Sequence, residues 1–252
     1  MPEIQPRLYP DLIGFRHPLP HLTEALRVQR RVKIVAIGSS STAGTNGIVP
    51  FPNRLEFVLR TRFFGRQIDV VNRGTGGQES LEELSRFEGD VIAEAPTLVI
   101  WQVGTNAVFH QVDYGYDDVE DAIAVGLDRL AALPMDVILM DAQFTREMVR
   151  INADSIAKGH KGPDGKTVMG FADDVELRIE RTAARAGVNL FRRWALMKRW
   201  YEDGVPLADL DDGMGNLHTS EWATKWLTIA LDRAIGAAVG SVRGARRQQF
   251  DI

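Results

Sequence analysis

The chain has 252 residues, and its 44% hydrophobic and 25% charged content is typical of one soluble globular domain of substantial size. Its 30 basic and 34 acidic residues give a formal net charge of −4, and the basic residues are scattered, which argues against a nucleic-acid-binding face. The absence of cysteine excludes a disulfide, a thiol nucleophile and a Cys-ligated zinc.

The N-terminal residues lack the basic-then-apolar pattern of a signal peptide, and no segment is long and apolar enough to span a membrane. We therefore expect a cytoplasmic protein by default, unless a leader has been removed. Residues 1–30 are predicted to form an arm, because residues 1–20 are rich in proline and lack periodicity. The arm is expected to lie over the body or over a neighbouring subunit, and the second arrangement would make the protein a homo-oligomer.

Five β-like runs then alternate with helical patterns, which predicts a mostly parallel five-stranded sheet covered on both faces. The runs are Val32–Ile37, Ile68–Val71, Leu98–Val103, Asp136–Met140 and Val188–Phe191. Three apolar helical faces lie between them: Leu55, Val58, Leu59 and Phe63; Val119, Ile123, Leu127 and Leu130; and Val175, Ile179, Ala183 and Ala186, before a helix stop at Gly187. The last helix is expected to begin at Thr219 or Ser220 and to bury Trp222, Trp226, Ile229 and Ala230.

One domain over residues 31–240 follows from this alternation, with a tail over residues 241–252. The polar, turn-rich segment Gly159–Gly165 interrupts the pattern at a place suited to a lid.

Reactive side chains follow several of the predicted strands. Ser40 follows the first, Asn72-Arg73-Gly74-Thr75-Gly76-Gly77 follows the second, and Gly104-Thr105-Asn106 follows the third. His218 lies just before the last helix. Because the loops after parallel strands emerge at one edge of a sheet, we expect these groups to converge there.

A hydroxyl, an imidazole and fixed hydrogen-bond donors are the groups that acyl transfer requires. Ser40 is a weak nucleophile unless a base takes its proton, and His218 is the candidate base. The N–H groups of Ser40 and Gly77 and the side-chain amide of Asn106 are candidate donors to the oxyanion, each worth ~2.7–4 kcal/mol by analogy with measured deletions.

The segments that carry Ser40, Gly77, Asn106 and His218 form four sequence blocks. With these four blocks the sequence resembles the SGNH hydrolases, also called the GDSL esterase and lipase superfamily. The first block, Gly-Asp-Ser-x-Thr, is matched by Gly38-Ser39-Ser40-Ser41-Thr42; the others are similar to Asn72-x-Gly74-x-x-Gly77, Gly104-Thr105-Asn106 and the loop bearing His218. The resemblance implies a flavodoxin-like three-layer α/β/α sandwich, with Ser40 as nucleophile and His218 as base.

Three positions depart from the family pattern. Ser39 replaces the Asp before the nucleophile, Ala107 replaces the Asp after the third-block Asn, and Gly215 stands where the family has an Asp three residues before its His. An acid must therefore come from elsewhere in the preceding loop or be missing. Asp212 is the first candidate, with Asp211 and Asp209 behind it, and a Ser40–His218 dyad is the alternative.

The expected activity is that of a serine esterase, without metal or cofactor, acting on small acyl esters, particularly acetyl esters of carbohydrates. Two other interpretations stay open. Residues Ser39 to Asn46 resemble the hydroxyl-rich phosphate loop of flavodoxins, which would hold FMN, and a non-catalytic carbohydrate-binding relative would need no reactive serine. Trp194 and Trp200 are either core residues or part of an acyl or sugar site.

Overall fold

The computed structural model describes residues 5–240, so the predicted tail, 241–252, lies outside the described residues. Its centre is one five-stranded sheet, formed by β1 (Arg31–Gly38), β2 (Gln67–Gly74), β3 (Leu98–Gln102), β4 (Asp136–Met140) and β5 (Asn189–Phe191). The strand order is β2-β1-β3-β4-β5 and every neighbouring pair is parallel. This is the flavodoxin-like order, and it confirms the predicted three-layer sandwich. The sheet is fully rather than mostly parallel.

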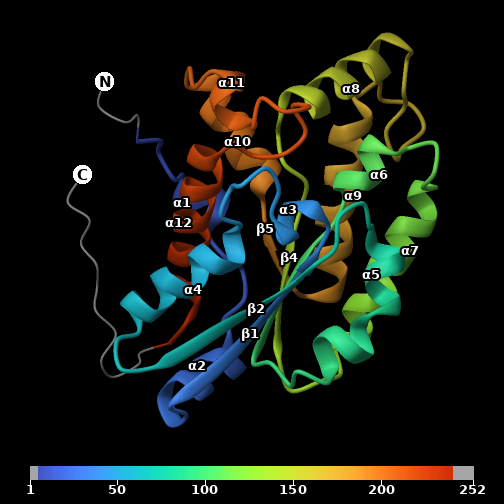
Figure 1. The fold of residues 1–252 in the computed structure, drawn as a ribbon. Coiled ribbons are helices and arrows are strands. Elements are labelled where there is room, and N and C mark those ends of the chain that lie inside the picture. The colour runs from blue at the N-terminus through green and yellow to red at the C-terminus, as the bar shows by residue number, and fades with distance from the viewer. Residues whose placement is uncertain (1–4, 241–252) are drawn as a thin grey trace.

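Helices cover both faces of the sheet, as Figure 1 shows. Helices α4 (Phe51–Arg62) and α12 (Glu221–Ala238) pack together on one side, and α5 (Ser80–Ser85), α7 (Tyr116–Ala131) and α9 (Phe171–Ala186) lie on the other. The remaining elements are α1 (Pro10–Ile13), α2 (Pro20–Val28), α3 (Ser40–Ala43), the π-helical turn η1 (Glu88–Ile92), α6 (Thr105–Phe109), α8 (Arg146–Ala157), α10 (Arg193–Glu202) and α11 (Leu207–Leu210).

The core lies between the sheet and these two helical layers. All five residues of β3 and of β4 are buried, as expected for inner strands of a parallel sheet covered on both faces. The predicted face of α7 is buried as a whole, and so is most of each of the other two predicted faces, whose members Val58 and Ala186 are only partly buried. Gly187 ends α9 in the left-handed conformation, with φ 66°, as predicted.

The start of the last helix was predicted correctly, but the prediction of which residues it buries was wrong. Helix α12 begins after Ser220, whose side chain accepts a hydrogen bond from the N–H of Ala223, but Trp222, Trp226 and Ile229 are only partly buried. Of the predicted set only Ala230 is fully covered; the buried stripe consists mainly of Ala223, Thr224, Leu227, Thr228, Ala230, Leu231, Ala234 and Ile235. The small residues of this stripe allow the helix backbone to approach its neighbours closely, and the bulky indoles lie at its flanks.

The described part of the arm packs on the body of its own chain. The indole of Trp200 donates to the carbonyl of Arg7 at 2.7 Å, and the N–H of Leu19 donates to the carbonyl of Ala238 at 3.1 Å. Leu22 and Leu26 of α2 are buried in the core. Residues 5–30 thus contribute to the same core as the sheet.

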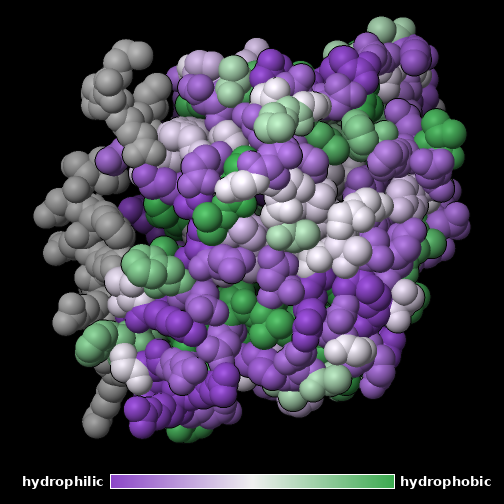
Figure 2. Space-filling model, viewed as in Figure 1, coloured by the Kyte–Doolittle hydropathy of each residue, from purple (hydrophilic) through white to green (hydrophobic). Residues whose placement is uncertain are grey.

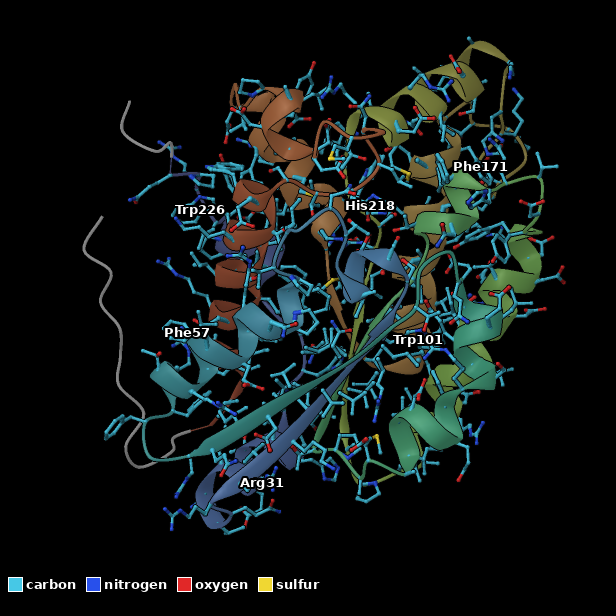
Figure 3. All side chains as sticks on the ribbon, in the orientation of Figure 1. Arg31, Phe57, Trp101, Phe171, His218 and Trp226 are labelled. Atoms are coloured by element: carbon cyan, nitrogen blue, oxygen red, sulfur yellow. The ribbon has the colours of Figure 1, made fainter. Side chains whose placement is uncertain are left out.

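Hydrophilic residues predominate on the face of the molecule in Figure 2, with apolar residues scattered among them. Phe57, on α4, is one exposed apolar side chain, and it points away from the body in Figure 3. Within residues 5–240, no helix combines the length and the apolar character that crossing a bilayer needs.

Candidate active site

The position of Ser40 depends on two glycines that α3 approaches closely. The residue begins α3, a four-residue helix just after β1. A Cβ on Gly38 would lie 2.4 Å from Thr42 Oγ1, and a Cβ on Gly74 would lie 2.1 Å from the backbone nitrogen of Ala43. Only glycine at these two positions lets α3 lie directly against the ends of β1 and β2.

His218 meets Ser40 at this edge of the sheet. Its Nε2 lies 2.9 Å from Ser40 Oγ, although the two residues are 178 positions apart in the sequence. Figure 3 shows His218 above α3, on the loop that leads into α12. The loop is closed by two backbone hydrogen bonds, from Asp212 N–H to the His218 carbonyl at 2.9 Å and from Ser220 N–H to the Leu210 carbonyl at 3.1 Å. The predicted convergence of the hydroxyl and the imidazole is therefore present in the structure.

The surroundings of His218 favour its neutral form. Burial lowers the pKa of the imidazole below its ordinary 6.5, and the negative charge of Asp212 opposes this shift in part. A neutral ring whose Nδ1 carries the proton offers Nε2 as an acceptor to the Ser40 hydroxyl.

The three candidate acids lie in different environments. Asp212 Oδ2 is 3.7 Å from His218 Nδ1, beyond hydrogen-bond distance, and it accepts a hydrogen bond from Asn46 Nδ2 at 2.5 Å. Asp211 is buried and forms a two-pronged ion pair with Arg146 at 2.7 and 2.8 Å. Asp209 is exposed, and its carbonyl accepts a hydrogen bond from Ser220. Asp212 is thus the candidate that faces the imidazole, without a direct hydrogen bond to it.

The other predicted residues lie around the same edge. The side chain of Asn106 is buried, and its Nδ2 donates to the Gln78 carbonyl at 2.7 Å. Gly77 adopts φ +81°, and a Cβ on Gly76 would lie 3.9 Å from the Cβ of Ser40, so the loop after β2 passes beside the serine. The structure brings the loop containing Gly77 to Ser40 and ties Asn106 to this loop.

Glu79 is a residue of this site that the sequence analysis missed. It is buried, and its carboxylate accepts hydrogen bonds from the N–H groups of Gly104 and Ala107, both at 2.9 Å. These bonds connect the loop after β2 to α6. The spacing of Glu79 and Glu82 is the sequence signal of a capping box at the start of α5, but it does not reveal the bonds to α6.

The hydroxyl groups beside Ser40 point into the protein. Ser39 Oγ and Thr42 Oγ1 donate to Gln102 Oε1 at 2.9 and 3.3 Å, and Ser41 Oγ donates to Gln143 Oε1 at 3.1 Å. Both glutamines are buried, and both were missed by the sequence analysis. For Gln102 the sequence did hold a signal, a polar residue at the end of an otherwise apolar strand.

A buried group of charges lies next to Gln143. Arg193 Nη2 donates to Gln143 Oε1 at 2.8 Å, and Arg193 Nε donates to the Asp141 carbonyl at 3.0 Å. Burial raises the pKa of Asp141 to about 6, and burial together with the charge of Asp141 raises the pKa of Glu176 well above its ordinary value. Burial therefore favours the protonated form of the Glu176 carboxyl.

The remaining sequence-based candidates have structural partners. Trp200 is fully buried, and Trp194 is nearly so, packed edge to face on Phe144. The core interpretation therefore holds for Trp200. In the segment Gly159–Gly165, His160 Nε2 lies 3.0 Å from Asp174 Oδ2, which ties the segment to α9.

The parallel α/β sandwich, with a serine and a histidine in contact at the carboxyl edge, defines the architecture of a hydrolase. A family model described as the Non-GDSL lipase-like family matches residues 7–157, more than half of the chain, and the chain belongs to that family. The enzyme class that goes with this family is carboxylic ester hydrolase. The matched residues include Ser40, Gly77 and Asn106 but not His218.

Solved structures show the same fold at low sequence identity. LAE5, an alpha/beta hydrolase enzyme from the metagenome of Lake Arreo in Spain, has a TM-score of 0.63 at 21% identity, over 83% of this chain and 97% of its own. Axe2, an acetylxylan esterase from Geobacillus stearothermophilus, has a TM-score of 0.63 at 20% identity, over 81% and 94%. Catalytic mutants of Axe2, in which a serine, a histidine or an aspartate is replaced by alanine, also match. No curated protein sequence matches the chain.

Proposed function

We propose that the protein is a serine esterase of the SGNH type that hydrolyses small acyl esters through an acyl-enzyme on Ser40. The observation that carries the proposal is the 2.9 Å contact between Ser40 Oγ and His218 Nε2. A hydroxyl and an imidazole at this distance form the nucleophile and base pair that acyl transfer uses. Burial keeps the imidazole in the form that accepts a proton.

The reaction proceeds in two halves. Ser40 Oγ attacks the ester carbonyl carbon while its proton passes to His218 Nε2, and the tetrahedral intermediate collapses as the alcohol leaves with that proton. Water then attacks the acyl-serine, gives its proton to His218, and the carboxylic acid departs as the proton returns to Ser40.

The oxyanion of each intermediate is assigned to the N–H groups of Ser40 and Gly77 and to the amide of Asn106. The Asn106 amide has two hydrogens and uses one on the Gln78 carbonyl, which orients the group. Pre-oriented donors of this kind stabilise the oxyanion without reorganisation during the reaction.

The acid is assigned to Asp212, acting through its charge. At 3.7 Å from His218 Nδ1 it stabilises the imidazolium that forms during the reaction, but it does not hold the ring by a hydrogen bond. The site therefore works as a Ser40–His218 dyad with a nearby carboxylate.

For the substrate we propose acetyl esters of carbohydrates. The likeness in fold to Axe2, an acetylxylan esterase, supports this choice, and the hydrophilic surface in Figure 2 is in keeping with a polar substrate. If long-chain acyl esters were turned over with a higher kcat/KM than acetyl esters or acetylated sugars, the substrate proposal would be wrong.

The test of the mechanism is covalent labelling. A fluorophosphonate should modify Ser40 in the wild-type protein, and Ser40→Ala should lose both labelling and ester hydrolysis while its Tm stays nearly unchanged. Ser85→Ala is the matched control, because its exposed hydroxyl donates to the Glu82 carbonyl of α5 and bonds to neither Ser40 nor His218. Retained turnover in Ser40→Ala would remove Ser40 from the mechanism.

Two observations count against the FMN alternative. Three of the four hydroxyls in the Ser39–Thr42 stretch are bound to Gln102 and Gln143, and the fourth, of Ser40, is bound to His218. A phosphate-binding loop would present these hydroxyls outward. A colourless purified protein without flavin absorbance is therefore expected.

A further inference from the structure

A chain of buried hydrogen bonds links the residue before Ser40 to the residue before His218. Ser39 Oγ donates to Gln102 Oε1 at 2.9 Å, and Gln102 Nε2 donates to Thr105 Oγ1 at 3.2 Å. Thr105 Oγ1 donates to Gln143 Oε1 at 2.9 Å, and Gln143 Nε2 donates to the Leu217 carbonyl at 2.9 Å. We infer that Gln102, Thr105 and Gln143 are positioning residues that hold the nucleophile and the base in register. This inference rests on the proposed function.

Obligate donors set the direction of the chain at both glutamines. The backbone N–H of Ser39 donates to Gln102 Oε1 at 3.2 Å, and Arg193 Nη2 donates to Gln143 Oε1 at 2.8 Å. Because neither group can accept a hydrogen bond, each glutamine must present its oxygen to these donors and its NH₂ group to the next link. Thr105 Oγ1 must then accept from Gln102 and donate to Gln143.

The chain is inaccessible to solvent along its length. Ser39, Gln102 and Thr105 are each 1% exposed, and Gln143 is 0% exposed. Water has little access to replace a broken link, so loss of the Thr105 hydroxyl leaves Gln102 Nε2 without its acceptor in the interior. Gln143 Oε1 would keep its donors Ser41 and Arg193. Hydrogen bonds that point in the same direction also polarise and strengthen one another.

Both ends of the chain act on the reacting groups through one covalent connection. Ser39 precedes Ser40 and is the residue from which α3 begins. The Leu217 carbonyl belongs to the peptide group that contains the His218 nitrogen, and Asp212 N–H holds the His218 carbonyl on the other side. Small displacements of either end change the Ser40–His218 distance, to which proton transfer is sensitive.

The chain also gives a physical reason for the serine at position 39. An ionised carboxylate has no proton to donate, so an Asp at this position would face the oxygen of Gln102 without a hydrogen bond. The Ser39 hydroxyl supplies the donor that the buried amide oxygen accepts. The serine that replaces the usual Asp of the SGNH pattern at position 39 is thus matched to Gln102, which accepts its hydrogen bond.

Thr105 offers the sharpest test, since Val has nearly its shape and lacks the hydroxyl. Thr105→Val removes the two central links, and we expect kcat to fall by about tenfold or more, with KM within about twofold of wild type. The rate of fluorophosphonate labelling of Ser40 should fall by a similar factor. Thr105→Ser keeps the hydroxyl and should restore both rates to within about threefold of wild type.

Thr97→Val is the matched control. Thr97 lies just before β3, at the opposite end from Gln102, and its Oγ1 donates to the Lys33 carbonyl at 3.1 Å. This variant loses a hydrogen bond outside the chain, so its kcat and labelling rate should match those of the wild type. If Thr105→Val kept wild-type kcat and labelling, or if Thr97→Val lost as much, the inference would be overturned.

Two further variants keep the outcomes distinct. If Thr105→Val does not fold, Ser39→Ala decides instead, because it removes the 2.9 Å hydroxyl bond to Gln102 and leaves only the 3.2 Å bond from the Ser39 N–H between these two residues. A loss in kcat of about fivefold or more supports the inference, and an unchanged kcat overturns it. Ser40→Ala is measured in parallel. Turnover by Ser40→Ala defeats the proposed function, whereas an inactive Ser40→Ala beside a fully active Thr105→Val defeats only the positioning chain.

Discussion

Asn46 donates a hydrogen bond to the Asp212 oxygen that faces His218. The Asn46 Nδ2 to Asp212 Oδ2 distance is 2.5 Å, and the other carboxylate oxygen accepts the N–H of Met214 at 2.9 Å. The side chain of Asp212 is only 1% exposed. These bonds hold the carboxylate in place 3.7 Å from His218 Nδ1.

Replacing Asp212 should therefore lower kcat less than replacing the acid of a hydrogen-bonded catalytic triad does. We expect Asp212→Ala to lower kcat by about 10- to 100-fold, below the ~10⁴-fold loss when a hydrogen-bonded acid is removed from a serine protease. The reason is that charge stabilisation is lost while no hydrogen bond to the ring is broken. Steady-state kinetics on an acetyl ester measure this, with Asp209→Ala as control. A loss near 10⁴-fold would show that the loop closes onto His218 during turnover.

Replacing Asn106 should affect kcat more than KM. Asn106→Ala should reduce kcat by roughly 10²–10³-fold if its amide meets the oxyanion, because that interaction forms only in the transition state. Tyr114→Phe is the control, since the Tyr114 hydroxyl donates to the Gly77 carbonyl at 3.2 Å and anchors the loop without reaching the amide. A higher KM at unchanged kcat in Asn106→Ala would assign the residue to ground-state binding.

The pH dependence of kcat/KM should follow His218. The base works only when neutral, and burial lowers its pKa below 6.5, so activity should rise with pH along a limb whose midpoint lies below 6.5. Asp212→Asn removes the charge that raises this pKa and should move the midpoint to more acidic pH. His160→Gln, in the segment between α8 and α9, should leave the profile in place. A midpoint above 7 in the wild type would contradict the assignment.

The buried carboxyl of Glu176 should make stability depend on pH. Its pKa is raised in the folded state, so its contribution to stability is present below pH ~4.5 and is lost as the pH rises toward the folded-state pKa. Glu176→Gln cannot ionise and should not show this loss of stability. In the wild type the loss amounts to about 1.4 kcal/mol for each unit by which folding raises the pKa of Glu176.

Thermal denaturation between pH 4.5 and 8 measures the effect. The Tm of Glu176→Gln minus that of the wild type should increase with pH over this range. The exposed Glu88, which pairs with Arg129, provides the control variant Glu88→Gln, whose difference should stay flat. A difference for Glu176→Gln that does not change with pH would contradict the raised pKa.

The sheet could be predicted from the sequence because strong local patterns encode it. Asp136–Met140 was predicted with its observed bounds, and each of the other four strands was found with one or both ends displaced, by at most three residues. Parallel strands buried on both faces are continuous apolar runs, and these are easily recognised. The inward face of α12 could not be read correctly, because its small residues become the buried stripe only through the fit against neighbouring elements.

The candidate site was predictable only where its residues follow strands. Ser40 and His218 were found because a loop motif and an imidazole before the last helix have a recognisable order, and their contact is present. Glu79, Gln102 and Gln143 were missed, since buried hydrogen bonds between residues far apart in the sequence leave no local pattern. The division into an arm, a domain and a tail stays a prediction.

The separation of 178 positions between Ser40 and His218 has a consequence for the protein during its synthesis. The serine leaves the ribosome well before the histidine and the α12 helix that follows it. A nascent chain that has completed β1 to β5 therefore still lacks His218, and the contact between Ser40 and His218 can form only after the loop before α12 has emerged.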